Sequence, residues 1–346
     1  MAQTPTTQSQ GRPGPEAAPV RDEEGRLVQA PPILFVGGTG RSGTHVLAKL
    51  VTTHPYLAMV PVEVRFHVEE RGFPGLLAGR VSKEQFVRRL RGFWWKGFQT
   101  RRMRGLYRFV PAEGFERAVA GFQASFDADP EGACRQLFYD LLWGRAERAG
   151  AFGIVEQSCD TIAAAPTLVR LFPEAKFLHV VRDGRDASAS RVTQTKGLIY
   201  PRTRRQGLAW WEERIRRIDA GARAVPPDRL LTVSLDELLL LPRPRALKPI
   251  CKFSGIYRQR KMKRFFSLRM SSELAHSERW RGGMSDRRAA LLERLYEEIL
   301  DRFEADGVRC APLLRRTLER SRASNANSLA PLAFLAGDGT PVGTAT

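Results

Sequence analysis

The stretch from Gly38 to His45 (GTGRSGTH) has the glycine spacing of a phosphate-binding loop but lacks that loop's lysine. In the nucleotide-binding loop G-x-x-x-x-G-K-[ST], the lysine reaches the terminal phosphates and the hydroxyl holds Mg²⁺. Here Thr44 stands at the lysine position and His45 at the hydroxyl position. The loop therefore lacks the side chains that bind ATP and Mg²⁺, and we expect no metal in it.

The donors that remain could still bind an anion. Backbone N–H groups at a helix N-terminus attract negative charge, and the Ser42 and Thr44 hydroxyls and the Arg41 guanidinium would add to them. Without a metal, such a site suits a ligand that carries fewer charges than a triphosphate. The expected contacts come from Gly40, Arg41, Ser42, Gly43, Thr44 and His45.

A second phosphate-binding group is expected in the run KFLHVVRDGRDASASR, residues 176–191. Arg182 ends a strand-like segment, and Asp183 and Gly184 form a turn into a helix. Ser190 follows Arg182 by eight residues, about two turns into that helix, so both side chains could meet around one phosphate.

Four short apolar runs could position these groups as buried strands, at residues 33–37, 153–156, 176–181 and 230–234. Helical spacing of apolar residues appears at residues 43–53 and 286–303. The alternation predicts an α/β fold with a P-loop-like, doubly wound parallel sheet flanked by helices, in which ligands lie beyond the carboxyl ends of the strands.

The run Arg41-Ser42-Gly43-Thr44 at a strand-to-helix turn resembles the phosphosulfate loop of sulfotransferases that use 3′-phosphoadenosine-5′-phosphosulfate (PAPS). The form is that of tyrosylprotein and carbohydrate sulfotransferases and their bacterial relatives. In this family an Arg and a Ser at the separation of Arg182 and Ser190 bind the 3′-phosphate. The resemblance implies PAPS as co-substrate and in-line transfer to an acceptor hydroxyl, with Arg41 stabilising the leaving group.

The segment Glu63-Val64-Arg65 resembles the Glu-x-Arg that supplies the catalytic base in tyrosylprotein sulfotransferases. A base near the acceptor hydroxyl is what transfer requires, and a neighbouring arginine could tune it. His67 and His54 are alternative bases, because small-molecule sulfotransferases use histidine. A surface salt bridge between Glu63 and Arg65 is the alternative without a catalytic role.

The segment RMSSELAHSERWRGGMS, residues 269–285, resembles the family's late donor-contacting loop. The resemblance gives Ser271 a catalytic contact to the sulfuryl oxygens and makes Ser272 and Arg281 donor-binding residues. A polar loop around a packed Trp280 is the alternative.

Two positions depart from the family pattern. Leu235 replaces a tyrosine that contacts the adenosine in relatives. Gln157 replaces a lysine that helps to stabilise the transferring group in tyrosylprotein sulfotransferases. A neutral donor, or Arg41, would have to supply that stabilisation.

The 56 Lys and Arg against 37 Asp and Glu give a net charge of +19, which favours an anionic ligand or partner. Residues 80–108 are basic with interleaved aromatics and predict a lid over an anionic or sugar-like acceptor, or a nucleic-acid surface. The alternative is a packed helical pair with solvated arginines, in which the inward-facing residues are Phe86, Leu90, Phe93, Trp94 and Phe98. A P-loop kinase or NTPase and a basic nucleic-acid-binding protein are the alternatives, although no nucleic-acid partner is expected. The expected acceptor is a sugar, a lipid, a natural product or a peptide tyrosine.

We expect one domain over residues 31–320 with a helical acceptor-side insertion at about 66–150, and disordered tails at residues 1–30 and 321–346. The four cysteines are far apart, which favours reduced thiols over a disulfide framework. We find no signal-peptide pattern or apolar run that could span a membrane, and we expect a cytoplasmic location.

Overall fold

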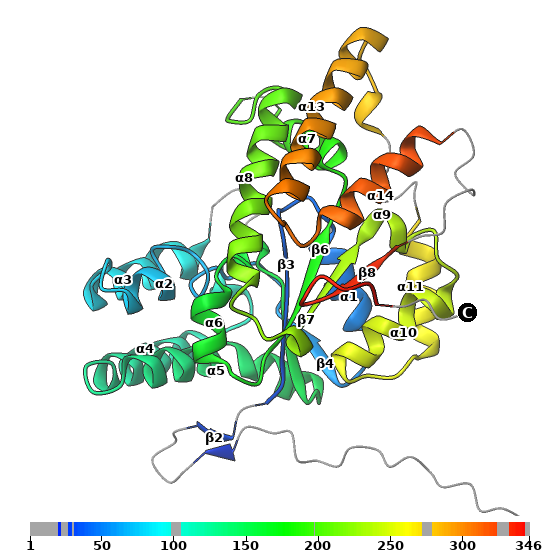
Figure 1. Ribbon diagram of the computed structural model, residues 1–346. Helices are drawn as coiled ribbons and strands as arrows, with labels where there is room; N and C mark the ends of the chain where they lie inside the picture. The colour runs from blue at the N-terminus through cyan, green and yellow to red at the C-terminus, as the bar shows by residue number, and fades with distance from the viewer. Residues whose placement is uncertain are drawn as a thin grey trace, which may run out of the picture.

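A six-stranded sheet with the order β4-β5-β3-β6-β7-β8 forms the centre of the protein (Figure 1). The computed structural model describes residues 20–21, 27–29, 31–97, 105–196, 198–271, 279–323 and 332–342. All neighbouring strands from β4 to β7 are parallel, and β8 runs antiparallel to β7. The strands are β3 (Ile33–Gly38), β4 (Leu57–Met59), β5 (Gly153–Glu156), β6 (Lys176–Val181), β7 (Leu230–Ser234) and β8 (Phe334–Ala336). The predicted doubly wound α/β fold is confirmed.

Helices cover both faces of the sheet, and successive side chains of β3 point alternately to the two faces. Phe35 packs on one side with α2 (Phe73–Leu77), α3 (Lys83–Arg89), α4 (Ala112–Ser125), α5 (Pro130–Ala149) and α6 (Ala165–Leu171). Val36 packs on the other side with α1 (Thr44–Val51), α9 (Leu235–Leu238), α10 (Arg243–Ser254) and α11 (Arg260–Arg269). Every residue of β3 is therefore buried, and its carboxyl end is held in place from both sides.

A third apolar cluster joins α7 (Gly184–Thr195), α8 (Arg204–Ala222), α13 (Asp286–Ala305) and α14 (Ala311–Arg322). Trp211 and Trp280 are its largest buried side chains. Helices α7, α8 and α13 stand together at the end of the sheet that β3 reaches at Gly38 (Figure 1). The cluster thus supports α7, which carries Ser190.

The predicted strands at 153–156, 176–181 and 230–234 have the predicted bounds, and the strand predicted at 33–37 extends to Gly38. The short strands β4 and β8 of the six-stranded sheet, with three residues each, were not predicted. The expectation of a disordered tail from residue 321 is wrong for residues 332–342: Phe334 is fully buried, and β8 pairs with β7. Most of residues 1–30 lie outside the described residues, but β1 (Val20–Arg21) and β2 (Leu27–Gln29) form a separate antiparallel pair.

The basic aromatic segment is packed where it is described, at residues 80–97 and 105–108. Phe86, Leu90 and Trp94 are buried in α3 and in the π-helical turn η1 (Leu90–Trp94). Arg89 and Arg91 form ion pairs with Glu69 and Glu116. This part of the segment is therefore the packed helical alternative, with several of its arginines in ion pairs. Phe98 lies outside the described residues.

Candidate active site

The loop between β3 and α1 turns sharply through left-handed backbone conformations. Gly40 and Gly43 have φ of 80° and 99°, and Arg41 adopts φ 64°, which costs a side-chain-bearing residue energy. A Cβ on Gly38 would lie 2.3 Å from the Oγ of Ser42, so only glycine admits the loop at this distance. The chain therefore returns over the strand end and begins α1 at Thr44 with no side-chain cap.

The Oγ of Ser42 is fully buried and has no hydrogen-bond partner among the described residues. A buried hydroxyl without a partner is costly unless a ligand or water satisfies it. The uncapped N-terminus of α1 lies beside it and adds backbone N–H donors. The loop therefore fits an anionic oxygen, as the sequence predicts for Gly40 to His45.

Arg41 connects this loop to the second predicted phosphate-binding group. Its Nε donates to the Oγ of Ser190 at 2.9 Å, and its backbone carbonyl accepts from Nη1 of Arg182 at 3.1 Å. Arg41 is exposed and Arg182 is buried. The structure therefore brings together all three side chains, which come from the loop, the end of β6 and α7.

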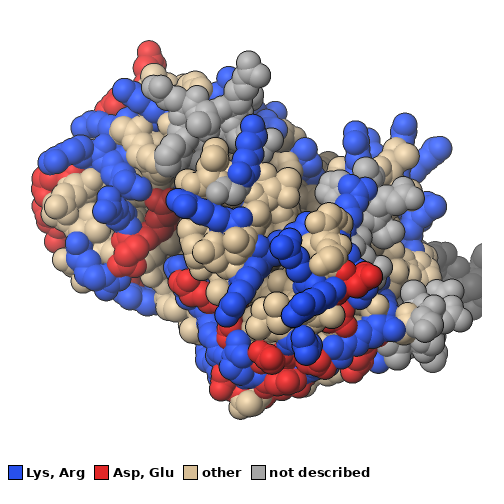
Figure 2. Space-filling view, turned by 90° about the horizontal axis from the view of Figure 1, so that it is seen from above, with Lys and Arg blue, Asp and Glu red and all other residues tan. Residues whose placement is uncertain are grey.

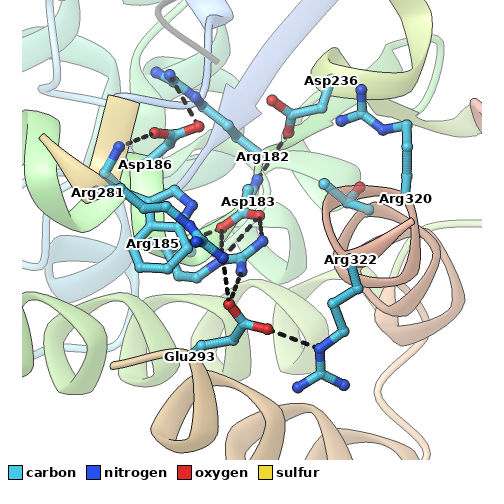
Figure 3. Close-up of polar contacts among 12 residues, drawn as sticks. Arg182, Asp183, Arg185, Asp186, Asp236, Arg281, Glu293, Arg320 and Arg322 are labelled. Carbon is cyan, nitrogen blue, oxygen red and sulfur yellow. Dashed lines mark hydrogen bonds and ion pairs between the residues drawn. The ribbon is translucent and has the colours of Figure 1, made fainter. Parts of the chain in front are cut away.

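Buried ion pairs fix the start of α7 (Figure 3). The N–H of Asp183 donates to Oδ2 of Asp236 at 2.8 Å, and Arg182 lies 3.9 Å from a carboxylate oxygen of Asp186. Burial raises the pKa of Asp236, and the charge of Arg182 opposes that rise. These carboxylates hold Arg182 at the strand end.

Arg185 belongs to the scaffold. Its guanidinium is fully buried and pairs with Asp183 at 2.6 Å (Figure 3). It also lies over the rings of Trp280 and Tyr296. The backbone N–H of Trp280 donates to Asp186 at 3.0 Å. For the segment at residues 269–285, the predicted alternative was a polar loop around a packed Trp280, and Trp280 is indeed buried.

Of the late-loop residues, Arg281 is largely exposed, and its guanidinium lies 2.9 Å from the Glu293 carboxylate (Figure 3). Its charge is thus partly neutralised by α13. Ser271 is half-buried and follows the end of α11, which contacts α1. Ser272 lies outside the described residues.

Glu63 lies beside the phosphate loop and is held from both carboxylate oxygens. Arg65 donates to Oε2 from Nε at 3.0 Å and from Nη2 at 2.5 Å. The thiol of Cys159 donates to Oε1 at 3.4 Å. The Sγ of Cys159 is also 3.9 Å from Oγ1 of Thr44, so the thiol joins Glu63 to the start of α1.

The protonation states suit these contacts. Burial, and then the Glu63 carboxylate, raises the pKa of the Cys159 thiol, which keeps it protonated and able to donate. Burial and the charge of Lys49 lower the pKa of His45, while a hydrogen bond with Gln157 and the charge of Glu63 act in the opposite direction. Gln157, at the family lysine position, is buried next to this imidazole.

The two alternative bases, His67 and His54, make contacts that support the fold. His67 is fully buried, with Nε2 3.0 Å from a Glu156 carboxylate oxygen and its ring stacked on Phe35. His54 lies beyond the far end of α1 with its Nδ1 accepting from the N–H of Tyr56, and burial lowers its pKa. Glu63 is the candidate base that lies next to the loop.

Leu235, at the position of the family tyrosine, closes the loop from behind. A Cβ on Gly43 would lie 2.7 Å from a Leu235 methyl group, and Leu235 is buried. Seen from above, the face at this end of the sheet carries many Lys and Arg side chains (Figure 2). The surroundings of the site therefore favour an anionic ligand.

The described residues contain no group of three or more His, Cys, Asp or Glu placed to hold a metal ion. None of the helices in the described ranges is long and apolar enough to cross a bilayer.

Comparison with known proteins identifies the family of the chain. The model of the family described as "Sulfotransferase family" matches residues 32–260, which is more than half of the chain. The chain therefore belongs to the sulfotransferase family.

Two relatives are protein-tyrosine sulfotransferases. The chain is 26% identical over 235 residues to protein-tyrosine sulfotransferase 2 of Gallus gallus, covering 67% of this chain and 53% of the relative. It is 27% identical over 229 residues to protein-tyrosine sulfotransferase of Drosophila melanogaster, covering 65% of this chain and 38% of the relative. The chain thus spans about half the length of these relatives or less. A solved sulfotransferase domain, from the olefin synthase of Synechococcus PCC 7002, is 20% identical with a TM-score of 0.45, over 74% of this chain and 89% of that domain.

The sequence analysis did not predict roles for Cys159, Asp183, Asp186 or Asp236. Cys159 meets Glu63 over a separation of 96 residues, and Asp236 meets Asp183 over 53. Asp183 and Asp236 are each the second residue after a predicted strand end, and this position is the one sequence signal that could have indicated them as supports for Arg182.

Proposed function

We propose that this chain transfers the sulfuryl group of PAPS to an acceptor hydroxyl. The observation that carries the proposal is the meeting of Arg41, Ser190 and Arg182 at the strand ends. Each of the two phosphate motifs alone could be an accidental turn, but together they form one basic site at a helix N-terminus. Membership of the sulfotransferase family supports the same donor.

In this proposal the 5′-phosphosulfate contacts the loop from Gly40 to His45, where the Ser42 hydroxyl lacks a partner among the described residues. Arg182 and Ser190 bind the 3′-phosphate. Arg41, whose Nε hydrogen-bonds Ser190 in the structure, would stabilise the charge that develops on the leaving phosphate. Positioning and charge stabilisation would supply most of the rate enhancement, as in phosphoryl transfer.

Glu63 is the proposed base. It takes the proton of the acceptor hydroxyl as the oxygen attacks sulfur, and Arg65 and Cys159 hold the two carboxylate oxygens in a fixed orientation. Gln157 stands where relatives have a lysine and hydrogen-bonds His45, so these two residues would offer hydrogen bonds to the transferring group in place of a fixed charge. Ser271 would add a contact to the sulfuryl oxygens, and Ser272 and Arg281 contacts to the donor.

The acceptor is a hydroxyl compound: a peptide tyrosine, as the names of the two relatives suggest, a sugar, a lipid or a natural product. A cytoplasmic location stays a prediction.

The donor site can be tested by ligand-dependent thermal unfolding. A ligand that binds only the folded state raises the melting temperature with its concentration. We expect adenosine 3′,5′-bisphosphate without metal to raise the melting temperature more than ATP with Mg²⁺ does. The opposite order would contradict the proposal and favour a kinase or NTPase.

A further inference from the structure

The segment of residues 238–271 concentrates the positive charge of the protein. It contains ten Lys and Arg residues, between Arg243 and Arg269, and no Asp or Glu. These ten charges are more than half of the net charge of +19 of the whole chain. The segment includes α10 and α11, which are in contact and lie side by side on the α1 side of the sheet (Figure 1).

All ten cations are exposed. The apolar residues of α10 and α11 explain why: Leu247 and Ile250 of α10 and Met262 and Phe266 of α11 pack inward, so the cations occupy the outer surface. We call this outer surface the basic face. Projecting Lys and Arg side chains are seen at the right of Figure 2, the side on which Figure 1 places these helices.

Among the described residues, the cations of the basic face lack the ion pairs that neutralise Arg and Lys side chains elsewhere. Within the described ranges, no carboxylate lies at ion-pair distance from any of the ten. By contrast, Arg315 and Arg322 on α14 each pair with acidic residues of α13. The positive potential of the basic face is therefore available to an outside partner.

The same segment exposes apolar side chains. Leu268 near the end of α11 is 58% exposed, and Leu240 before α10 is 40% exposed. Tyr257, between the two helices, is 52% exposed while its ring is held edge-on against His54. Exposed leucines contribute little to a nucleic-acid backbone contact, but they can enter the boundary between lipid head groups and acyl chains.

We propose that the basic face binds the surface of an anionic lipid bilayer and holds the protein there as a peripheral protein. Clustered Lys and Arg are attracted to acidic head groups within about a Debye length, and amphipathic helices add buried apolar area. The contact lies on α10 and α11, outside the candidate active site. It does not depend on the proposed sulfuryl transfer.

Vesicle flotation tests the proposal with the full chain. Vesicles of an equimolar mixture of phosphatidylserine and phosphatidylcholine should carry the wild-type protein at low salt, and high salt should release it. Vesicles of pure phosphatidylcholine should carry little. If the protein fails to float with the phosphatidylserine vesicles, the proposal is overturned.

The triple variant Lys261→Gln, Lys263→Gln, Arg264→Gln locates the contact, because all three side chains are exposed on α11. Each charge removed near the bilayer should lower the affinity for the vesicles about fivefold, so the triple variant should bind them about 100-fold more weakly. The matched control Arg287→Gln, Arg288→Gln, Arg294→Gln removes the same charge from exposed positions of α13 and should bind as the wild type does. Equal weakening of both variants would mean that net charge alone acts, and would overturn the assignment to the basic face.

Leu268→Ser separates a bilayer from other polyanions. Its exposed position lets the fold survive, which thermal unfolding checks. We expect a several-fold weaker binding to the phosphatidylserine vesicles and an unchanged affinity for duplex DNA. If vesicle binding is unchanged by Leu268→Ser and duplex DNA displaces the vesicles, the basic face is a general polyanion surface and the proposal fails.

Discussion

The Nε of Arg41 donates to the Oγ of Ser190 at 2.9 Å, although 149 residues separate the two in the chain. The contact joins the loop after β3 to the second turn of α7, and Arg182 reinforces it through the backbone carbonyl of Arg41. A side chain at this junction can contact both phosphate groups of a ligand that carries two. The loop and the helix are therefore parts of one site.

Replacing Arg41 tests its role in the chemical step. Arg41→Ala should keep part of the affinity for adenosine 3′,5′-bisphosphate but lower kcat about 100- to 1000-fold, because a donor aimed at developing charge acts mainly in the transition state. Calorimetric binding together with sulfuryl transfer rates checks both effects. Substantial remaining turnover would rule out this role for Arg41.

Ser190→Ala should weaken bisphosphate binding about 10- to 100-fold, since hydrogen bonds to charged groups are among the stronger ones. Thr193→Ala is the matched control, because Thr193 is exposed on the same helix. Isothermal titration of both variants gives the comparison. If Thr193→Ala loses as much affinity as Ser190→Ala, the effect comes from the helix and not from the Ser190 hydroxyl.

Arg182 should recognise the 3′-phosphate. In Arg182→Ala the affinity for adenosine 3′,5′-bisphosphate should fall towards that for adenosine 5′-monophosphate, while binding of the monophosphate changes little. Because Arg182 is buried and donates to the carbonyl of Arg41, thermal unfolding must show that the variant is folded. An equal loss for both nucleotides would place Arg182 in the scaffold alone.

The predictable part of the fold was the part encoded in local apolar runs. The four predicted strands are continuous and buried on both faces, whereas β4 and β8 have three residues each and no period to detect. Phe334 is ordered by pairing with β7, a contact across about 100 residues that the Ala- and Ser-rich composition around it cannot indicate.

The candidate site also combines residues in local motifs with contacts between segments that are distant in the sequence. Arg41, Arg182 and Ser190 belong to local motifs at strand ends, so the sequence alone indicated them as candidate site residues. The support that Cys159 gives to Glu63 and that Asp236 gives to Asp183 arises only when distant segments pack. Neither cysteine nor aspartate at those positions has a local spacing that indicates a partner.

Glu63 and Cys159 should act as a unit. Glu63→Gln should lower kcat about 100- to 10,000-fold by removing the base. Cys159→Ala removes one hydrogen-bond donor to the carboxylate and should lower kcat about tenfold, while Cys159→Ser, which keeps a donor, should restore it. Cys134→Ala, at a buried cysteine of α5, is the control. A kcat that is the same in Cys159→Ala and wild type would exclude the positioning role of the thiol.

His179 gives the stability of the fold a pH dependence. Burial lowers its pKa from 6.5 to about 4, so between these values the unfolded chain binds the proton and the folded chain does not. The neutral His179 side chain therefore contributes fully to the free energy of unfolding above about pH 6.5. This contribution, about 3 kcal/mol in all, is lost as the pH falls towards 4. Urea unfolding should show that wild type loses stability more steeply than His179→Gln over this range. Parallel curves would contradict the shift.

Incubation with PAPS that carries radioactive sulfur tests the central claim most directly. The label is followed into the protein, glycan, lipid and small-molecule fractions of a lysate, with wild type and Arg41→Ala side by side. We predict that wild type moves the label from the donor into one of these acceptor fractions and that Arg41→Ala does so at least about 100-fold more slowly. If wild type, shown to bind adenosine 3′,5′-bisphosphate, leaves the label on the donor in every fraction, or if Arg41→Ala transfers it equally well, the proposed function is contradicted.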